Sequence, residues 1–246
     1  MTNSRSPTRA SFALIAALTA LLWSAPGITA ETMHETRAVS GSITSVRLIG
    51  PIDMSISQGE TRGVMLDGTA DDLARIRVEV SGGEMTVRFE QGATGWLSIG
   101  SHRAPKATVA LADLRKIAVV GSGDVAMAPF NLSEDKLEIE VTGSGDVKLS
   151  SLKAKSLSVN IRGSGDVAAS GQVGAQDIAI AGSGDYAGND LQSQTSAISI
   201  KGSGDAAVWA TDALAVSIAG SGDVSYRGQP KLSQSIAGSG EVHQVR

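Results

Sequence analysis

The sequence contains no cysteine and has few aromatic and proline residues. Among its 246 residues there are 3 tryptophans, 2 tyrosines, 3 phenylalanines and 6 prolines. The absence of cysteine excludes a disulfide framework, thiol chemistry and a cysteine-attached lipid anchor. The low aromatic content implies a core built from aliphatic side chains, which the hydrophobic share of 41% can supply.

Basic residues and histidines are also scarce. The chain has 21 Lys and Arg against 25 Asp and Glu, a formal net charge of -4, so it lacks the clustered basic charge that nucleic-acid binding requires. The histidines, His34, His102 and His243, have neither metal-ligand spacing nor the pattern of a catalytic triad. We interpret the acidic pair Asp71-Asp72 as charge at the start of a helical turn. The sequence therefore predicts no nucleic-acid partner, no enzyme activity, no cofactor and no metal site.

The first thirty residues have the order of a secretory signal peptide. Arg5 and Arg9 precede the apolar run 12–23, and small residues lead to Ala30. This run is shorter than the roughly 20 apolar residues that a membrane-spanning helix needs. We predict a signal peptide over 1–30 and a mature chain without a transmembrane segment. The mature chain is expected in the periplasm, on the cell surface or outside the cell.

Glycine, with 29 residues, is abundant because of an internal repeat. Gly-Ser-Gly-Asp occurs six times, Gly-Ser-Gly-Glu closes the series, and the first glycines are 22, 20, 19, 20, 18 and 18 residues apart. We interpret the motif as structural. Its glycines and acids are Gly121, Gly123, Asp124, Gly143, Gly145, Asp146, Gly163, Gly165, Asp166, Gly182, Gly184, Asp185, Gly202, Gly204, Asp205, Gly220, Gly222, Asp223, Gly238, Gly240 and Glu241.

The residues around each motif alternate between apolar and polar. Ile139 and Val141 precede the second copy, and Val147 follows it. This period of two, with β-branched residues on one side, is typical of a half-buried strand. Carried through the motif, the alternation places its glycines toward the core and Ser144 and Asp146 on the surface. A bulge at the motif would reverse that parity.

The length of the repeat indicates the architecture. About 18–22 residues are too few for a propeller blade, and the repeat has no helical period. We predict an all-β, single-stranded, right-handed parallel β-helix (β-solenoid) with one repeat per coil. We expect 31–246 to be a single domain, with irregular N-terminal coils over 31–116 and the repeat coils over 117–246.

The segment before the repeats also has strand patterns. A helical turn is expected within 67–73 with Thr69 as its cap, and a loop over 91–106. The expected strands are Ile43–Ile49, Ile52–Ile56, Val64–Leu66, Ile76–Val80, Met85–Phe89 and Thr108–Leu111.

The sequence as a whole resembles a known family. Ser42–Gly59 resembles its opening pair of strands, Ile76–Val87 its following hairpin, and the Gly-Ser-Gly-Asp-Val units its recurrent motif. The family is the putative auto-transporter adhesin head GIN domain, a bacterial domain of unknown function. The resemblance covers about 40–246. It implies a β-helix like that of pectate lyases without their catalytic residues, and the family name suggests adhesion.

The resemblance and the repeat together predict an exported, non-catalytic protein for cell-envelope or surface interaction. Its partner is expected to be an unknown protein or glycan of the cell envelope. The alternative is a polysaccharide-binding or polysaccharide-cleaving protein on a pectate-lyase-like scaffold. Trp96, Trp209 and Tyr226 are candidate sugar-stacking platforms, with the alternative that they fill gaps in the fold.

The repeated acids and the final strand leave two questions open. Stacked carboxylates about 5 Å apart repel by about 0.8 kcal/mol per adjacent pair in water. That repulsion is relieved either by capping of backbone N–H groups at the bend or by a column of cations such as Ca²⁺. The final coil presents a strand edge, which Glu241, His243 and Arg246 either blunt or leave open for end-to-end self-association.

Overall fold

The computed structural model describes residues 32–90 and 104–245, which lie in one compact unit, Glu31–Arg246. Strands account for 70% of the structure and helix for 3%, and the stacked parallel strands form a β-solenoid of about 6 turns. The predicted all-β solenoid is therefore confirmed. The signal-peptide prediction for 1–30 lies outside the described residues. Within those residues, no helix is long and apolar enough to cross a membrane.

The described residues form seventeen strands and one short helix. In chain order they are β1 (Met33–Arg37), β2 (Ser45–Ile49), β3 (Asp53–Gln58), β4 (Val64–Gly68), α1 (Ala70–Arg75), β5 (Ile76–Ser81), β6 (Glu84–Phe89), β7 (Lys106–Leu111), β8 (Lys116–Gly121), β9 (Val125–Met127), β10 (Phe130–Gly143), β11 (Val147–Gly163), β12 (Val167–Gly182), β13 (Tyr186–Gly202), β14 (Ala206–Gly220), β15 (Val224–Arg227), β16 (Lys231–Gly238) and β17 (Val242–Gln244).

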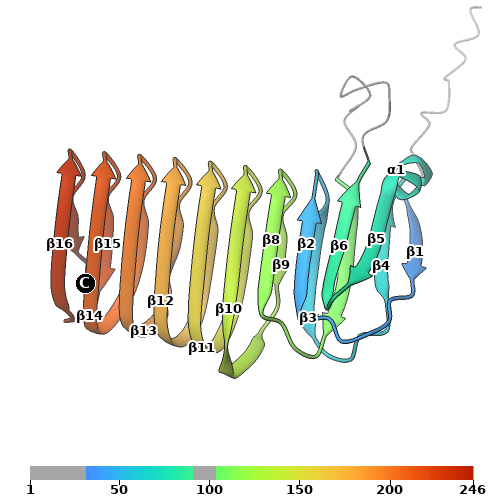
Figure 1. Ribbon diagram of the computed structural model, residues 1–246, viewed down its shortest axis with the longest axis horizontal. Helices are drawn as coiled ribbons and strands as arrows, with labels where there is room; N and C mark the ends of the chain where they lie inside the picture. The colour runs from blue at the N-terminus through green and yellow to red at the C-terminus, as the bar shows by residue number, and fades with distance from the viewer. Residues whose placement is uncertain (1–31, 91–103, 246) are drawn as a thin grey trace, which may run out of the picture. The chain divides into compact units, whose positions relative to one another are not determined.

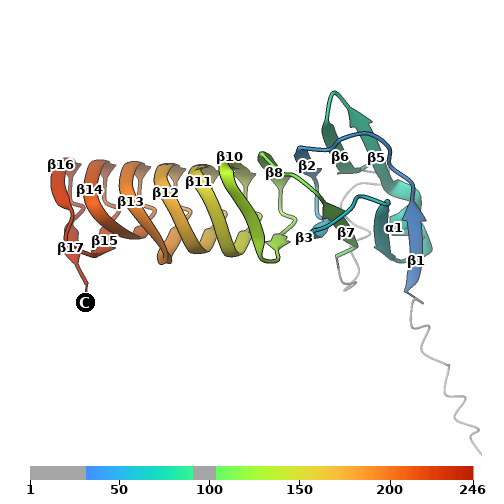
Figure 2. The same cartoon turned by 90° about the horizontal axis from the view of Figure 1, so that it is seen from below.

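The repeat coils stack by parallel pairing in register. Strand β10 pairs with β8 on one side and β11 on the other, and the series continues through β12, β13 and β14 to β16. Equivalent motif residues are paired, so Gly143 lies between Gly121 and Gly163. Figure 1 shows these strands side by side, and Figure 2 shows β11 to β14 as successive windings. The spacing of the motif is therefore the length of one coil.

The aliphatic residues before and after the motif form the core. In the coil of β10, Ile139 and Val141 are fully buried, and Val147 at the start of β11 is 1% exposed. Between them Gly145 is buried, whereas Ser144 and Asp146 are exposed. The inward direction is confirmed for the second glycine of the motif, and the outward direction for its serine and aspartate, whereas the first glycine, Gly143, is half-buried. Val141 and Val147 are both buried, so no bulge reverses the alternation across the motif.

The motif forms the corner at which each coil turns. Its first glycine has positive φ, as at Gly163 with +129°, a conformation that side chains rarely allow. The second glycine has no such φ but has no room for a side chain. A Cβ atom at Gly165 would lie 2.3 Å from the Gly145 carbonyl oxygen and 2.9 Å from Val141 Cγ1. A Cβ atom at Gly163 would also lie 2.2 Å from the Gly143 carbonyl oxygen, so the first glycine is required for both conformational and steric reasons and the second for a steric reason.

The N-terminal coils do not follow the order of the chain. Strands β2 and β3 lie between the later β6–β7 coil and the β8–β9 coil, with parallel pairing on both sides. Beyond them the pairing becomes antiparallel, β5 with β6, β4 with β7 and β1 with β4. Antiparallel strands therefore close this end of the parallel stack.

Ion pairs join the outward faces of the N-terminal coils. Arg47 Nε lies 3.0 Å from Glu84 Oε1, and this hydrogen bond lowers the pKa of Glu84. Lys116 Nζ lies 3.0 Å from Glu140 Oε1 and lowers the pKa of that carboxyl through a hydrogen bond. These side chains are about one-third exposed, so the pairs add little stability and mainly select the register of neighbouring strands.

The six strands expected before the repeats are found with boundary shifts of a few residues. Strand β1 was not expected, because its side chains are largely exposed and show no apolar alternation. The helical turn is α1, and Thr69 caps it as predicted. Thr69 Oγ1 accepts a hydrogen bond from the Asp72 amide, and the Asp72 carboxylate accepts one from the Thr69 amide. Residues 91–103 of the expected loop lie outside the described residues.

Candidate functional site

The repeated acids form a hydrogen-bonded ladder along one corner of the solenoid. Each aspartate carboxylate of the ladder accepts a hydrogen bond from the backbone N–H of the acidic residue in the next coil of the stack, as Asp166 Oδ1 does from the Asp185 amide at 2.8 Å. The rungs, in order along the stack, are Asp53, Asp124, Asp146, Asp166, Asp185, Asp205, Asp223 and Glu241.

The ladder favours hydrogen bonds from backbone N–H groups, over bound cations, as the interaction that offsets the repulsion between neighbouring carboxylates. A hydrogen bond to a charged acceptor contributes about 1.5–3 kcal/mol, which exceeds the repulsion expected between neighbouring rungs. The capped amide belongs to the next coil and not to the aspartate's own bend, so each carboxylate also ties two coils together. Among the described residues no cluster of three or more His, Cys, Asp or Glu side chains is arranged to hold a metal ion.

Removal of metal ions is therefore expected to leave the stability of the protein unchanged. If backbone amides stabilise the carboxylates, EDTA has no cation to extract from the ladder. The measurement is thermal unfolding by circular dichroism with EDTA and, separately, with added CaCl₂. A midpoint several degrees lower in EDTA and restored by calcium would show that cations occupy the acidic column.

Asp53 is a rung that the motif search missed. It follows Gly50-Pro51-Ile52, which keeps the first glycine and the acid of the motif but not the second glycine. Strand β2 before it and β3 after it carry the same alternation of buried residues as a repeat coil. A search for this flanking alternation, with only the first glycine and the acid fixed, would have found it.

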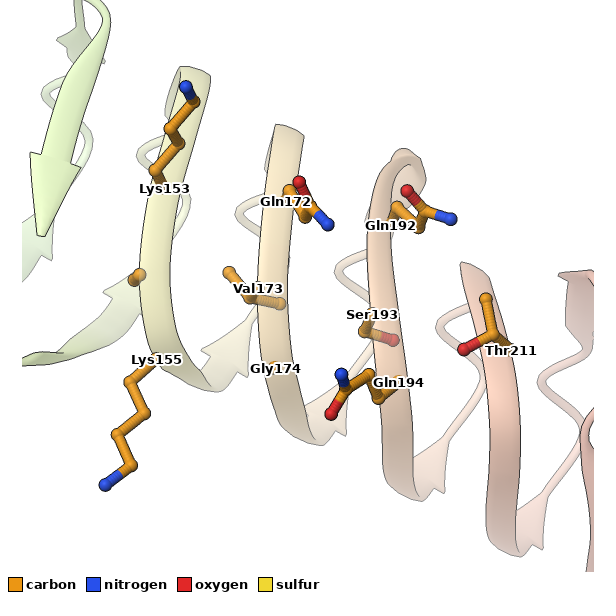
Figure 3. A pocket seen from close by; sticks show the side chains of 10 residues that line it. Lys153, Lys155, Gln172, Val173, Gly174, Gln192, Ser193, Gln194 and Thr211 are labelled. Atoms are coloured by element: carbon orange, nitrogen blue, oxygen red, sulfur yellow. The ribbon is translucent and has the colours of Figure 1, made fainter. Parts of the chain in front are cut away.

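A polar hollow lies on a different side of the coils. It has a volume of about 520 Å³ and crosses β11, β12, β13 and β14 (Figure 3). We call it the polar trough. Its lining residues are Lys153, Ala154, Lys155, Gln172, Val173, Gly174, Gln192, Ser193, Gln194 and Thr211.

The trough follows a second corner of the coils, where strand pairing is interrupted. Lys153, Gln172 and Gln192 are paired in register and form one row. Lys155, Gly174, Gln194 and Thr211 occupy the corner positions between two paired segments of adjacent coils, and they form a second row. Gly174, which lies between Lys155 and Gln194 in the second row, contributes no side chain. The rows flank a hollow instead of a flat sheet.

Hydrogen-bond donors dominate the trough. Figure 3 shows Lys153 and Lys155 extending in opposite directions from the same strand, with Gln172, Gln192 and Gln194 on the next two coils. The trough is lined by two lysines and by no carboxylate. Ammonium and amide groups in this arrangement donate hydrogen bonds to carboxylate, phosphate or hydroxyl oxygens of a bound molecule.

A buried polar network supports the trough from inside. Tyr186 Oη donates to Gln176 Oε1 at 2.8 Å, and Gln176 Nε2 donates to Ser193 Oγ at 2.9 Å. Ser193 Oγ in turn donates to the Trp209 carbonyl at 2.9 Å and lies 2.9 Å from Ser196 Oγ. Burial raises the pKa of Tyr186, which keeps its hydroxyl protonated as a donor. Ser193 both belongs to this network and lines the trough, so the network fixes the corner.

The remaining candidate residues are not brought together. His34 lies on β1 beside Asp67, and His243 lies on β17 at the other end of the stack. Asp71 and Asp72 lie in the first turn of α1, as interpreted from the sequence. His102 lies outside the described residues. The two described histidines therefore lie at opposite ends of the stack and do not share a site.

Two of the candidate aromatic side chains, Trp209 and Tyr226, lie in the described residues and are each partly covered. The Arg227 guanidinium lies over the Trp209 ring, 4.8 Å from its centroid, and so covers one face. Tyr226 is partly buried against the core. The packing of Tyr226 against the core favours the gap-filling interpretation for that residue, and Trp209 has one ring face engaged by Arg227. Trp96 lies outside the described residues.

The fold and these surfaces define a parallel β-solenoid protein with an acidic ladder on one corner and a polar trough on another. The model of the family "Putative auto-transporter adhesin, head GIN domain" matches residues 43–230. The chain belongs to this family, as its motifs indicated. None of the curated proteins compared with the chain matches it.

Several solved structures have the same fold. A putative adhesin from Bacteroides fragilis has a TM-score of 0.80 and 23% identity, covering 87% of this chain and 97% of that one. A putative adhesin from Parabacteroides distasonis has a TM-score of 0.69 and 20% identity, covering 88% and 98%. A putative lipid binding protein from the same organism has a TM-score of 0.66 and 23% identity, covering 87% and 97%. At these identities the likeness establishes the fold.

Proposed function

We propose that the chain is an exported, non-catalytic binding protein of the cell envelope or cell surface, and that its role is adhesion. The family and two of the three structures described above are putative adhesins, which supports a surface-interaction role. The observation that carries the proposal is the polar trough, since it presents side-chain donors at the regular spacing of stacked coils. A rigid row of this kind suits an extended partner better than a small molecule.

The proposed ligand is an envelope glycan that carries carboxylate or phosphate groups. Lys153 and Lys155 supply positive charge at one end of the trough, and three glutamines continue the donor rows. Anionic groups would pair with the lysines, and sugar hydroxyls would accept hydrogen bonds from the amides. The ligand class thus follows from two lysines in a trough without a carboxylate.

Replacing both trough lysines is expected to weaken binding at least about tenfold, since two charge-assisted contacts are lost. The experiment compares Lys153→Ala/Lys155→Ala with Lys148→Ala/Lys201→Ala, which removes two exposed lysines outside the trough. Retention is measured on an immobilised polyuronate and on isolated cell envelopes. Equal retention of both variants on every matrix would refute the trough as the binding site.

The same polyuronate preparation distinguishes binding from cleavage. Incubation with the protein is expected to release no new reducing ends and no unsaturated products. Turnover that depends on protein concentration would replace the binding proposal with the polysaccharide-cleaving alternative.

Export rests on the order of charged, apolar and small residues before Glu31. The protein isolated from the producing cell is expected to begin at Glu31 and to be found outside the cytoplasm. Cell fractionation followed by mass spectrometry of the intact chain measures both. A cytoplasmic protein that retains residues 1–30 would contradict this part of the proposal.

A further inference from the structure

The final repeat coil leaves an open strand edge. Among the described residues, β16 pairs with β14 alone, and all eight of its residues are exposed. Leu232 is 40% and Ile236 38% exposed, whereas Leu214 and Ile218, which they pair with on β14, are each 1% exposed. The stacked rows of inward aliphatic side chains that form the core therefore continue onto β16, where no further strand among the described residues covers them.

The side chains of β16 suit pairing with another neutral strand. Lys231 is its sole charged residue, and Leu232, Gln234 and Ile236 continue the inward columns of Leu214, Val216 and Ile218. Gln234 is an exception within its column. The six preceding coils have an isoleucine or a valine at this position, namely Ile117, Ile139, Val159, Ile178, Ile198 and Val216. An amide therefore stands where the fold otherwise uses an aliphatic side chain.

We propose that β16 forms a tail-to-tail dimer with a second copy of this chain. The two β16 strands pair antiparallel around a two-fold axis at Gln234. In this register Leu232 lies opposite the second copy's Ile236, and Gln234 lies opposite its own counterpart. The two amides then donate to and accept from each other, and the apolar columns of both solenoids form one continuous core.

The pattern of β16 selects this register. A shift by one residue would place inward side chains opposite outward ones. A shift by two residues would place Gln234 opposite Leu232 or Ile236 and leave its amide without a polar partner. When the two-fold axis passes through Gln234, apolar side chains lie opposite apolar side chains and the two Gln234 amides lie opposite each other. Lys231 then lies opposite the second copy's Ala237, so no like charges meet.

A head-to-tail arrangement fits the same edge poorly. At the other end, the edge strand of the sheet that contains β16 is β5, which pairs only with β6 among the described residues and is shorter than β16. Its inward side chains, Ile76, Val78 and Val80, are all aliphatic, so they would leave the Gln234 amide without a polar partner. Head-to-tail contacts also generate open filaments, whereas the self-complementary β16 edge closes after two copies.

Single cysteines introduced into this cysteine-free chain test the geometry. Directly opposed residues of antiparallel strands have Cα atoms about 4.5–5.5 Å apart, within the range that a disulfide spans. Gln234→Cys is therefore expected to give a disulfide-linked dimer on mild oxidation. Ser217→Cys, an exposed position on β14, is the matched control and is expected to remain monomeric on a non-reducing gel.

Sedimentation of the full exported chain tests the dimer without crosslinking. The unaltered protein is expected at twice the monomer mass. Gln234→Lys, which sets two ammonium groups face to face, is expected to raise the dimer dissociation constant at least about tenfold. Ser235→Lys, on the outward face, is expected to leave it unchanged. A monomer at all concentrations, unlimited polymers, or equal crosslinking of the two cysteine variants would overturn the proposal.

Discussion

Replacing Gly184 with alanine is expected to lower the free energy of unfolding by about 4 kcal/mol or more. The added Cβ would lie 2.2 Å from the Gly165 carbonyl oxygen and 2.9 Å from Ile161 Cγ2. The first contact is with backbone in the middle of a stack, so neither coil can move away without breaking its pairing. For a domain of this size the loss corresponds to a midpoint about 8–16 °C lower.

The control for this substitution is Gly59→Ala. Neither glycine has a positive φ, and a Cβ at Gly59 would meet only the Ala110 side chain at an ordinary 3.5 Å. Gly59→Ala is therefore expected to change stability by less than about 0.5 kcal/mol. Urea unfolding followed by circular dichroism compares the two variants. A Gly184→Ala protein as stable as Gly59→Ala would mean that the coils are not stacked as closely as the structure shows.

This contrast shows why the motif could be recognised from the sequence but only partly explained by it. Alternation around Val141 was sufficient to place the second glycine of the motif toward the core. The clash between a Cβ added at Gly184 and the Gly165 carbonyl oxygen depends on how neighbouring coils are offset from each other. The sequence of a single coil does not determine that offset. The steric reason for glycine at both positions of the corner therefore became visible only with the coils stacked.

The order of the first coils could not be predicted either. Strands β2 and β3 precede β6 and β7 in the chain but lie between them and β8–β9 in the stack. Each strand has the same local alternation, so nothing in a strand's own pattern selects its neighbour. Partner choice follows from long-range pairing, including the Arg47–Glu84 ion pair across β2 and β6.

The polar trough was missed for a related reason. The motif corner has a fixed sequence, whereas Lys155, Gly174, Gln194 and Thr211 share no residue type. They become neighbours because each lies where pairing is interrupted in its own coil. The distance from the motif to this corner also varies, since the repeats differ in length. A search for a repeated sequence motif therefore identifies the corner that builds the solenoid. It misses the polar trough, which is the proposed ligand-binding surface.

Changing Tyr186 is expected to have the second-largest effect among the predicted substitutions. Tyr186 pairs with Val167 on one side and Ala206 on the other, so valine is the residue that the repeat itself would place there. Tyr186→Val is expected to cost about 2–4 kcal/mol, because it leaves a cavity and removes the donor to Gln176. The ring also occupies space that the absent side chain of Gly188 leaves open.

Tyr186→Phe separates the hydrogen bond from the packing. It keeps the ring but leaves the buried Gln176 Oε1 without its donor, at an expected cost of about 1–3 kcal/mol. Adding Gln176→Leu is expected to recover part of that cost, because replacing both partners leaves no unpaired oxygen. The control is Tyr226→Phe, at a half-buried tyrosine, with an expected change below about 0.5 kcal/mol. Urea unfolding of the unaltered protein, Tyr186→Phe, Gln176→Leu and the double variant completes the double-mutant cycle. Equal stabilities of Tyr186→Phe and Tyr226→Phe would show that the network beneath the trough does not hold the corner in place.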